Sequence, residues 1–222
     1  MYTDMQLDEL HEASIETMAE VRRHMENYLL LSDQLNEQAR EHALYGISRR
    51  LSTIHECFSF FFSEVPPEIN YEIDRELRAT CDIHLHAYLI NLCGIMDNIA
   101  WMWAYSSGLQ DRVDLERNRV RIGLFNNWFI PNLPLALQEL VNTYRDWYEF
   151  TIDHRHPTAH RIPPYIVPYV VHENQEGIQT PSYILRFCHS GNEPRLVNLH
   201  PQVIADTRTI NLLLTTTYNE MI

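Results

Sequence analysis

The sequence predicts a mostly α-helical domain, an up-and-down helical bundle that carries a small C-terminal β-hairpin and a terminal helix. Apolar residues recur at helical spacing in five long stretches, and prolines or a glycine separate several of them. Only the segment after Pro163 and Pro164 changes to the Val-, Ile- and Tyr-rich composition of strands. A chain of 222 residues suffices for one buried core. We therefore expect one domain over residues 1–222, with residues 163–190 as a hairpin appendage.

The first two expected helices form a hairpin. Residues 5–31 place apolar side chains at roughly helical spacing with acidic residues between them, which is typical of an amphipathic helix. Ser32 or Asp33 has the side chain of an N-cap and can start a second helix, which runs to Phe62. Two prolines, at positions 66 and 67, then end it.

The third expected helix, from about Tyr71 to Tyr105, is the central one. After Ile83 its apolar residues cover most of the circumference, as in a helix that others surround. Gly108 marks its end, because glycine readily adopts the left-handed backbone that closes many helices. The charged stretch 111–121 indicates a polar connection or a short exposed helix.

A fourth helix should follow Pro131 and Pro134 and cover about residues 135–155. Pro157 disfavours the helical backbone at the residue before it, His156. We therefore expect the continuous helix to stop or kink sharply at this point.

The C-terminal part combines strands with a last helix. Residues 165–171 and 182–188 are rich in Val, Ile and Tyr, and Gly177 lies between them, which predicts a β-hairpin. From Pro201 to about Tyr218 apolar residues return to a helical repeat, which predicts the terminal helix.

The charge balance is acidic and restricts how the chain could contact nucleic acid. The formal net charge is −13. Broad attraction to nucleic acid depends on many contacts between basic side chains and phosphates, so any contact with RNA has to be local. All 17 basic residues are Arg, whose planar guanidinium suits bidentate phosphate contacts.

Features of targeting and cofactor binding are few. The four cysteines are scattered without a CxxC pair, as expected of reduced packing residues. The first 18 residues are acidic and amphipathic, unlike a signal peptide. The longest apolar run, residues 87–105, contains Asn91, Asp97 and Asn98, which argues against a membrane span. We expect a cytoplasmic protein without a membrane contact, a cofactor or a bound metal.

The segment from Asp153 to Pro164 concentrates three His and two Arg within eight residues. A helix C-terminus attracts cations, so surface capping of a helix end is one interpretation. The other is a catalytic pair, in which the Arg155 guanidinium contacts a phosphate and His160 transfers a proton near neutral pH. Metal-independent RNA cleavage needs a base for the 2′-hydroxyl and a cation for the phosphate, and this pair supplies both.

This arrangement resembles the motif of the HEPN superfamily, in which an Arg and a His separated by four to six residues stand at the end of a long helix. Arg155 and His160 have four residues between them, and His156 follows the Arg where the family often has a polar residue. The likeness covers about residues 75–162 and takes in the helix that contains Asp97 and Asn98.

The resemblance implies a HEPN-like bundle that dimerises and brings two copies of the motif to one cleft. Arg155 and His160 would then be catalytic residues of a metal-independent endoribonuclease, with His156 and Arg161 in supporting roles. Such members include toxins and defence ribonucleases, which makes RNA the expected substrate and an antitoxin one partner to test. Other members are inactive proteins that bind a nucleotide or a partner, which is the alternative function.

Asp97 and Asn98 lie in an otherwise apolar stretch and need polar partners if they are buried. A polar network that fixes the register of packed helices is one interpretation. The functional alternative is that one of them orients Arg155 or His160, because a nearby carboxylate would hold the Arg and favour a protonated His.

A metal-binding helical bundle is a second alternative, with His84, His86, His156 and His160 as ligands. His156 and His160 are four residues apart and would share a helical face, but Pro157 interrupts that face. His84 and His86 are two residues apart and point in nearly opposite directions, so both cannot serve one site.

A non-catalytic interaction protein is the third interpretation. In it the motif is structural, and Arg155 pairs with a carboxylate such as Asp153 or Glu149. Helix-rich chains of this size often dimerise, so a dimer alone does not separate this interpretation from the enzyme.

Overall fold

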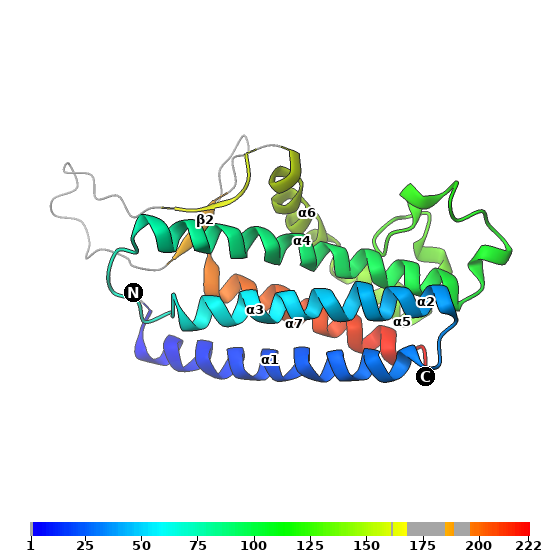
Figure 1. Ribbon diagram of the computed structural model, residues 1–222, viewed down its shortest axis with the longest axis horizontal. Coiled ribbons are helices and arrows are strands. Elements are labelled where there is room, and N and C mark those ends of the chain that lie inside the picture. The colour runs from blue at the N-terminus through cyan, green and yellow to red at the C-terminus, as the bar shows by residue number, and fades with distance from the viewer. Residues whose placement is uncertain (1, 161, 168–184, 189–195) are drawn as a thin grey trace.

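The computed structural model describes residues 2–160, 162–167, 185–188 and 196–222, apart from the side chains of Ala159 and His160. Four long helices lie side by side along the length of the molecule (Figure 1). They are α1 (Asp4–Ser32), α3 (Arg49–Ser63), α4 (Arg75–Ser106) and α7 (Leu199–Asn219). The predicted fold class, mostly α with a terminal helix, is confirmed. None of the described helices has the length and apolarity needed to cross a lipid bilayer.

Helix α4 is the centre of the bundle, as predicted. It packs against α3, α6 (Arg145–His160) and α7, and its buried residues face several directions around its axis. Asp74 caps its first turn by accepting a hydrogen bond from the Leu77 backbone amide. The chain leaves its other end through Gly108, whose φ of 68° lies in the left-handed region that glycine adopts without strain.

The second helical segment begins later than predicted. Asn36, not Ser32 or Asp33, is its N-cap, and the Asn36 side chain accepts a hydrogen bond from the Ala39 amide. Ser32 still belongs to α1, where its hydroxyl donates to the Leu29 carbonyl, and Asp33 closes that helix. The α1 helix therefore uses both candidate residues for its own C-terminal turn.

This second segment is continuous but not uniform. A short helix α2 (Glu37–Glu41) passes into a π-helical stretch, η1 (His42–Ser48), and then into α3. The wider turns of a π-helix occur mostly as short insertions and often mark functional sites. Gly46 lies within this stretch and is buried against α4. A Cβ atom there would come within 2.0 Å of the Asn98 Oδ1 atom and 2.9 Å of the Asn98 Cβ atom.

The segment between α4 and α5 (Leu135–Thr143) is an irregular connection with short 3-10 turns, in agreement with the predicted polar stretch. The turns are η2 (Leu109–Asp111), η3 (Arg119–Arg121) and η4 (Ile130–Asn132). The Trp103 indole nitrogen donates to the Asn132 carbonyl and ties the end of this connection to α4. The connection therefore stands beside the C-terminal half of α4 (Figure 1).

The predicted fourth helix consists of two helices, and the second of them does not stop at His156. It divides at Tyr144, whose backbone leaves the helical region (ψ 20°), into α5 and α6. Helix α6 also continues through Pro157 to His160. Pro157 removes only one backbone donor near the end of the helix. In the same turns, the Thr158 hydroxyl donates to the His154 carbonyl and His154 Nδ1 lies 2.8 Å from the Phe150 carbonyl oxygen.

The pairing of the two hairpin strands was predicted correctly, but the sheet contains one more strand than predicted. Strand β1 (Tyr165–Ile166) pairs antiparallel with β2 (Arg186–Cys188), as expected. A third strand that the sequence did not indicate, β3 (Leu196–Asn198), pairs with the other edge of β2 and leads directly into α7. Gly177 lies outside the described residues. The sheet is held to α4, because Asp82 Oδ1 accepts a hydrogen bond from the Ile166 amide.

A buried carboxyl joins α6 to α7. Asp206 is fully enclosed, and its Oδ1 atom accepts hydrogen bonds from the Trp147 indole (2.8 Å) and the Gln202 amide (2.7 Å). Burial raises the pKa of Asp206 to about 6 from an ordinary value of 3.8, although both hydrogen bonds act in the opposite direction.

Asp206 should therefore make stability depend on pH. As the pH rises, the unfolded carboxyl ionises near 3.8 while the buried one keeps its proton to about 6, so the folded state loses stability across this window. We expect the free energy of unfolding of wild type, relative to Asp206→Asn, to fall by about 2 to 3 kcal/mol between pH 4 and pH 7. Urea unfolding of both proteins at several pH values measures this difference, and parallel profiles would contradict it.

The close approach at Gly46 can be tested by adding one methyl group. Gly46→Ala should lower the free energy of unfolding by about 1 to 3 kcal/mol, because the new Cβ meets the first atoms of the Asn98 side chain. Gly123→Ala is the matched control, since a Cβ there meets nothing nearer than 3.8 Å. Denaturant unfolding that shows equal effects at the two glycines would refute the close approach.

Candidate functional site

Three charged side chains from three helices meet where α3 and α6 flank α4. Arg50 comes from α3, Asp97 from α4 and Arg155 from α6. Both guanidinium groups lower the pKa of the Asp97 carboxyl, and Arg155 has the larger effect of the two. Among the ion pairs of the described residues, none joins Asp97 directly to either Arg. The Asp97 carboxylate therefore lies near two cations but forms a direct ion pair with neither.

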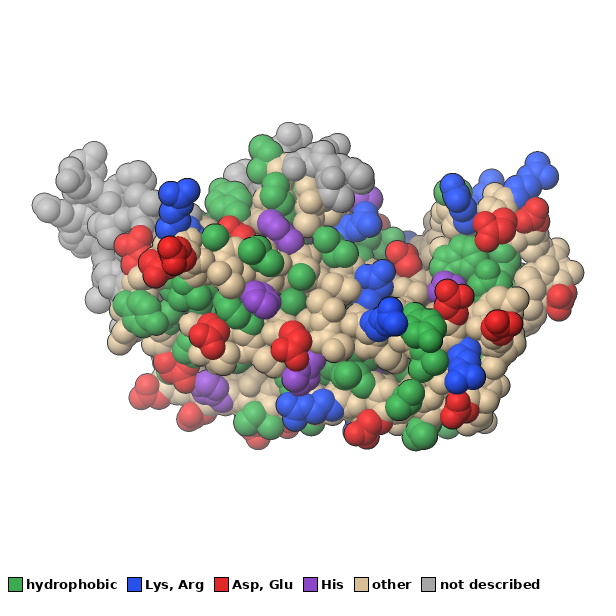
Figure 2. Space-filling model, in the orientation of Figure 1, with side chains coloured by type: hydrophobic (Ala, Val, Ile, Leu, Met, Phe, Trp, Pro, Cys, Tyr) green, Lys and Arg blue, Asp and Glu red, His purple; other side chains and the backbone are tan. Residues whose placement is uncertain are grey.

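Asp97 is reachable by solvent and yet surrounded by protein. Its side chain is exposed, but desolvation by the surrounding protein is the largest influence on its pKa and raises it above 3.8 in spite of the two Arg residues. The carboxyl thus faces solvent while neighbouring protein removes part of its hydration. On the face that Figure 2 shows, the surface is hollowed between the prominence at the end of α6 and the connection that follows α4. Basic side chains lie on both sides of this hollow.

Arg50 is held over α4 by a glycine. Its guanidinium lies across Gly94, where an added Cβ would come within 2.3 Å of the Arg50 Cζ atom. One nitrogen of the guanidinium donates to Asn91 Oδ1 at 3.1 Å, and the Asn91 amide donates back to its own helix at Ala87. The remaining donors of Arg50 have no hydrogen-bond partner among the described residues. A planar fork that is fixed at one corner in this way suits a phosphate or carboxylate ligand.

Two further titratable groups line the inner side of the cluster. Burial raises the pKa of the Cys93 thiol to about 12, and the neighbouring Asp97 carboxylate acts in the same direction. The pKa of the Tyr148 hydroxyl is also raised, first by burial and then by Asp97. Because only a thiolate is a strong nucleophile, Cys93 stays an inert packing residue at neutral pH, as the sequence indicated.

The structure brings together only part of the predicted site. Arg155 and Asp97 share it, whereas Asn98 faces η1, where its Oδ1 atom lies 2.9 Å from His42 Nδ1. His156 is exposed on the next position of α6. The backbone of His160 ends α6, but the His160 side chain and the whole of Arg161 lie outside the described residues.

The described contacts support neither a metal site made by the histidines nor a structural ion pair of Arg155. His84 stacks on Phe60 at 3.9 Å, and His86 Nε2 lies 2.6 Å from the Pro164 carbonyl oxygen, so each has a separate packing role. Within the described part of the chain, no three His, Cys, Asp or Glu residues are grouped as metal ligands. The ion pairs described for the chain also include none between Arg155 and Asp153 or Glu149.

Sequence reasoning missed Arg50 and its glycine. The available signal was Gly94 itself, because an isolated glycine inside a long apolar helix usually marks a close approach. What the sequence could not supply was the partner. Arg50 precedes Gly94 by 44 positions and comes from a different helix, so only the packing of α3 on α4 brings them together.

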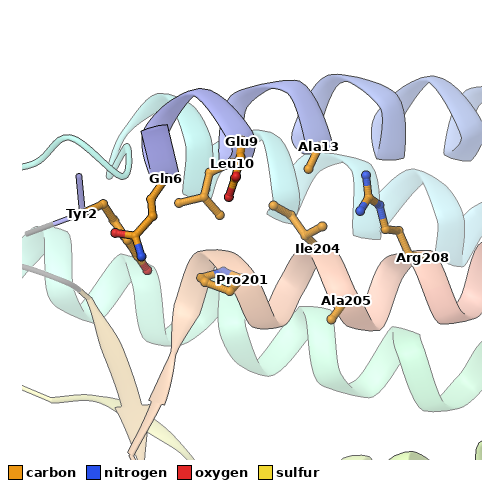
Figure 3. A pocket seen from close by; sticks show the side chains of 9 residues that line it. All are labelled: Tyr2, Gln6, Glu9, Leu10, Ala13, Pro201, Ile204, Ala205 and Arg208. Carbon is orange, nitrogen blue, oxygen red and sulfur yellow. The ribbon is translucent and has the colours of Figure 1, made fainter. Parts of the chain in front are cut away.

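A separate groove lies at the other face of the bundle and contains none of the predicted site residues. Figure 3 shows its lining side chains, which come from the N-terminal part of α1 and the start of α7. Its volume is about 530 Å³. Leu10, Ala13 and Ile204 give it an apolar floor, and Arg208 at its end already pairs with Glu16.

Comparisons with known proteins give no match: no protein-family model, no curated protein and no solved structure matches this chain. The chemistry of the site has to be argued from its own geometry.

The electrostatic interaction between Arg155 and Asp97 can be measured without a substrate, through the pKa of Asp97. Arg155→Gln should raise the pKa of Asp97, because it removes the stronger of the two cations that favour the carboxylate. Arg50→Gln should raise it by a smaller amount, and Arg208→Gln, whose side chain pairs with Glu16 on α1, should not change it. Carbon-detected NMR titration of the carboxyl groups reads these values. If the Asp97 pKa is unchanged in Arg155→Gln, the two side chains do not interact and the arrangement described here is wrong.

Proposed function

We propose that this protein is a metal-independent endoribonuclease of the HEPN type. One observation carries the proposal: Arg155, the first residue of the Arg-x4-His motif, lies close enough to the exposed Asp97 carboxyl to lower its pKa, as Arg50 does, and it stands on a helix whose last residue is His160. Perturbed ionisable groups that gather in a concave surface are a common property of catalytic sites.

The chemistry that these groups fit is an internal transfer of the RNA phosphodiester. A base removes the proton of the 2′-hydroxyl, the 2′-oxygen forms a bond to phosphorus, and the bond from phosphorus to the 5′-oxygen breaks. The 5′-oxygen leaves with a proton from an acid. The products are a 2′,3′-cyclic phosphate and a 5′-hydroxyl, and no water, metal or redox partner enters this step.

Each residue has a role that its chemistry allows. His160 is the candidate acid or base, because imidazole exchanges protons near neutral pH. Arg155 and Arg50 are candidate donors to the phosphoryl oxygens, on which negative charge develops in the transition state. Asp97 is a candidate positioning residue whose charge attracts both guanidinium groups without a direct ion pair, and His156 and Arg161 are candidate contacts to the neighbouring phosphates.

The acidic balance of the chain is compatible with this function if binding is local. With a net charge of −13 the molecule repels RNA over most of its surface, so the RNA should engage only the site around Arg155 and Arg50. The site would then contact few phosphates, and affinity should depend only weakly on salt. The HEPN resemblance also favours a homodimer with two sites in one cleft and, for a toxin, an antitoxin that covers them.

The proposal is tested by cleavage of a mixed RNA pool in excess chelator, with wild type and variants compared. His160→Ala should lower the rate by about 10² to 10⁴, the usual contribution of a general acid or base. Arg155→Ala should lose about 10² to 10³, as for one transition-state donor. Glu149→Gln, an exchange on the same helix, serves as the control and should cleave at the wild-type rate. Circular dichroism should show the same helix content in all four proteins.

The ends of the fragments decide the mechanism. Wild-type fragments should carry 2′,3′-cyclic phosphates. Lack of cleavage by wild type would favour the alternative function, an inactive HEPN-like protein that binds a nucleotide or a protein partner. Cleavage that the chelator stops would require a metal and would reject the proposed chemistry.

A further inference from the structure

Three ring side chains form a stack on the same face of α4 as the candidate site. His42 lies nearly parallel to Trp101, with ring centroids 5.8 Å apart and planes 11° apart, and nearly parallel to Tyr105, at 5.8 Å and 18°. Trp101 and Tyr105 are themselves stacked at 5.7 Å. All three residues are only partly buried. Trp101 and Tyr105 pack against the hydrophobic core with part of their surface, and the three rings leave the rest open to solvent.

The stack is fixed in place by hydrogen bonds on its polar side. The Asn98 amide nitrogen donates to the Gly94 carbonyl at 2.6 Å, so the Asn98 oxygen faces His42. His42 Nδ1 therefore donates to this oxygen, which sets the plane of the imidazole ring. The close packing of Gly46 on Asn98 holds η1 against α4 at the same place. The rings are thus preorganised, and little side-chain entropy would be lost on binding a flat ligand.

The stack lies further along α4 than the Arg50 guanidinium. Gly94, beneath the Arg50 guanidinium, and Trp101 are seven residues apart on α4, which is two turns or ~10 Å along the helix. On the helical segment that carries His42, the Arg49 guanidinium lies 4.5 Å from the centroid of the exposed Tyr45 ring. Arg side chains and rings thus come from the same pair of helical segments, and sites that bind single-stranded nucleic acid combine these two kinds of side chain.

The opposite end of the stack is acidic. Burial raises the pKa of the Tyr105 hydroxyl, and the carboxylates of Glu116 and Glu41 act in the same direction. A phosphate at that end would be repelled, whereas one at the Arg50 end would be attracted. The charges thus give a bound strand one favoured placement, with its phosphates toward Arg50 and Arg155 and one base on the rings.

We propose that His42, Trp101 and Tyr105 form a subsite that stacks an unpaired base of the RNA next to the phosphate at Arg155. This inference rests on the proposed function and narrows its substrate class to single-stranded RNA. Bases in a duplex are stacked on each other and cannot lie on protein rings, so a duplex would lose this contact.

The subsite is tested by binding, not by cleavage. Fluorescence anisotropy would measure binding of a labelled single-stranded RNA, the same RNA in a duplex, and an abasic strand of equal length, all to the full-length His160→Ala protein. The double change Trp101→Leu and Tyr105→Leu in this background removes the rings but keeps apolar bulk. Tyr71→Leu, which removes an exposed ring elsewhere on the surface, is the matched control.

We expect single-stranded RNA to bind more tightly than the duplex or the abasic strand. The double variant should bind the single strand about 5- to 100-fold more weakly, the range for stacking of one base. Its affinity for the abasic strand should not change. Trp101→Phe, which keeps a ring, should retain most of the wild-type affinity, and this separates stacking from loss of folding.

Failure of this inference differs from failure of the proposed function. Cleavage by wild type, together with equal binding of single-stranded RNA by the double variant and its parent, would overturn the subsite alone. Tight binding that depends on the rings, without any cleavage, would retain the subsite and reject the nuclease. Equal weakening for the base-bearing and abasic strands would show a structural role for the rings and would also overturn the subsite.

Discussion

The close approach of η1 and α3 to helix α4 is the constraint on which the candidate site depends. Gly46 and Gly94 allow it, because each leaves the space of a side chain to a polar residue of the opposite helix, Asn98 and Arg50 respectively. The π-helical stretch and the two glycines therefore determine where His42 and Arg50 lie on α4. A single methyl group at either glycine would have to displace one of these polar side chains.

The same helix explains how an acidic chain can present a basic site. Helix α4 is buried over most of its circumference, but the Asp97 side chain is exposed on it. Desolvation by the surrounding protein raises the pKa of Asp97, and the Arg155 and Arg50 guanidinium groups lower it. Charges beside desolvating protein interact through protein more than through water, so their fields are stronger there than on a flat surface. The local field, not the net charge, is what a phosphate would meet.

Most of the fold could be predicted from the sequence, because apolar periodicity and proline positions are local signals. Errors arose where neighbouring elements decided the outcome. Asn36 replaced Ser32 as the N-cap because α1 extended further, and α6 continued through Pro157 because side-chain hydrogen bonds supported its last turns. Strand β3 was missed because a three-residue strand has too short a pattern to recognise. In the site, Arg155 and Asp97 could be named from the sequence, but Arg50 and the ring stack depend on contacts between distant segments.

The proposed nuclease attacks the phosphodiester with the 2′-hydroxyl of the substrate itself. The most direct measurement uses a single-stranded RNA in which only the nucleotide before a mapped cleavage position is 2′-deoxy. If the account is correct, wild-type protein in excess chelator will cut the unmodified strand there and leave the substituted strand intact at that position. Continued cleavage at the 2′-deoxy nucleotide would mean that another nucleophile attacks the phosphate, and it would contradict the account.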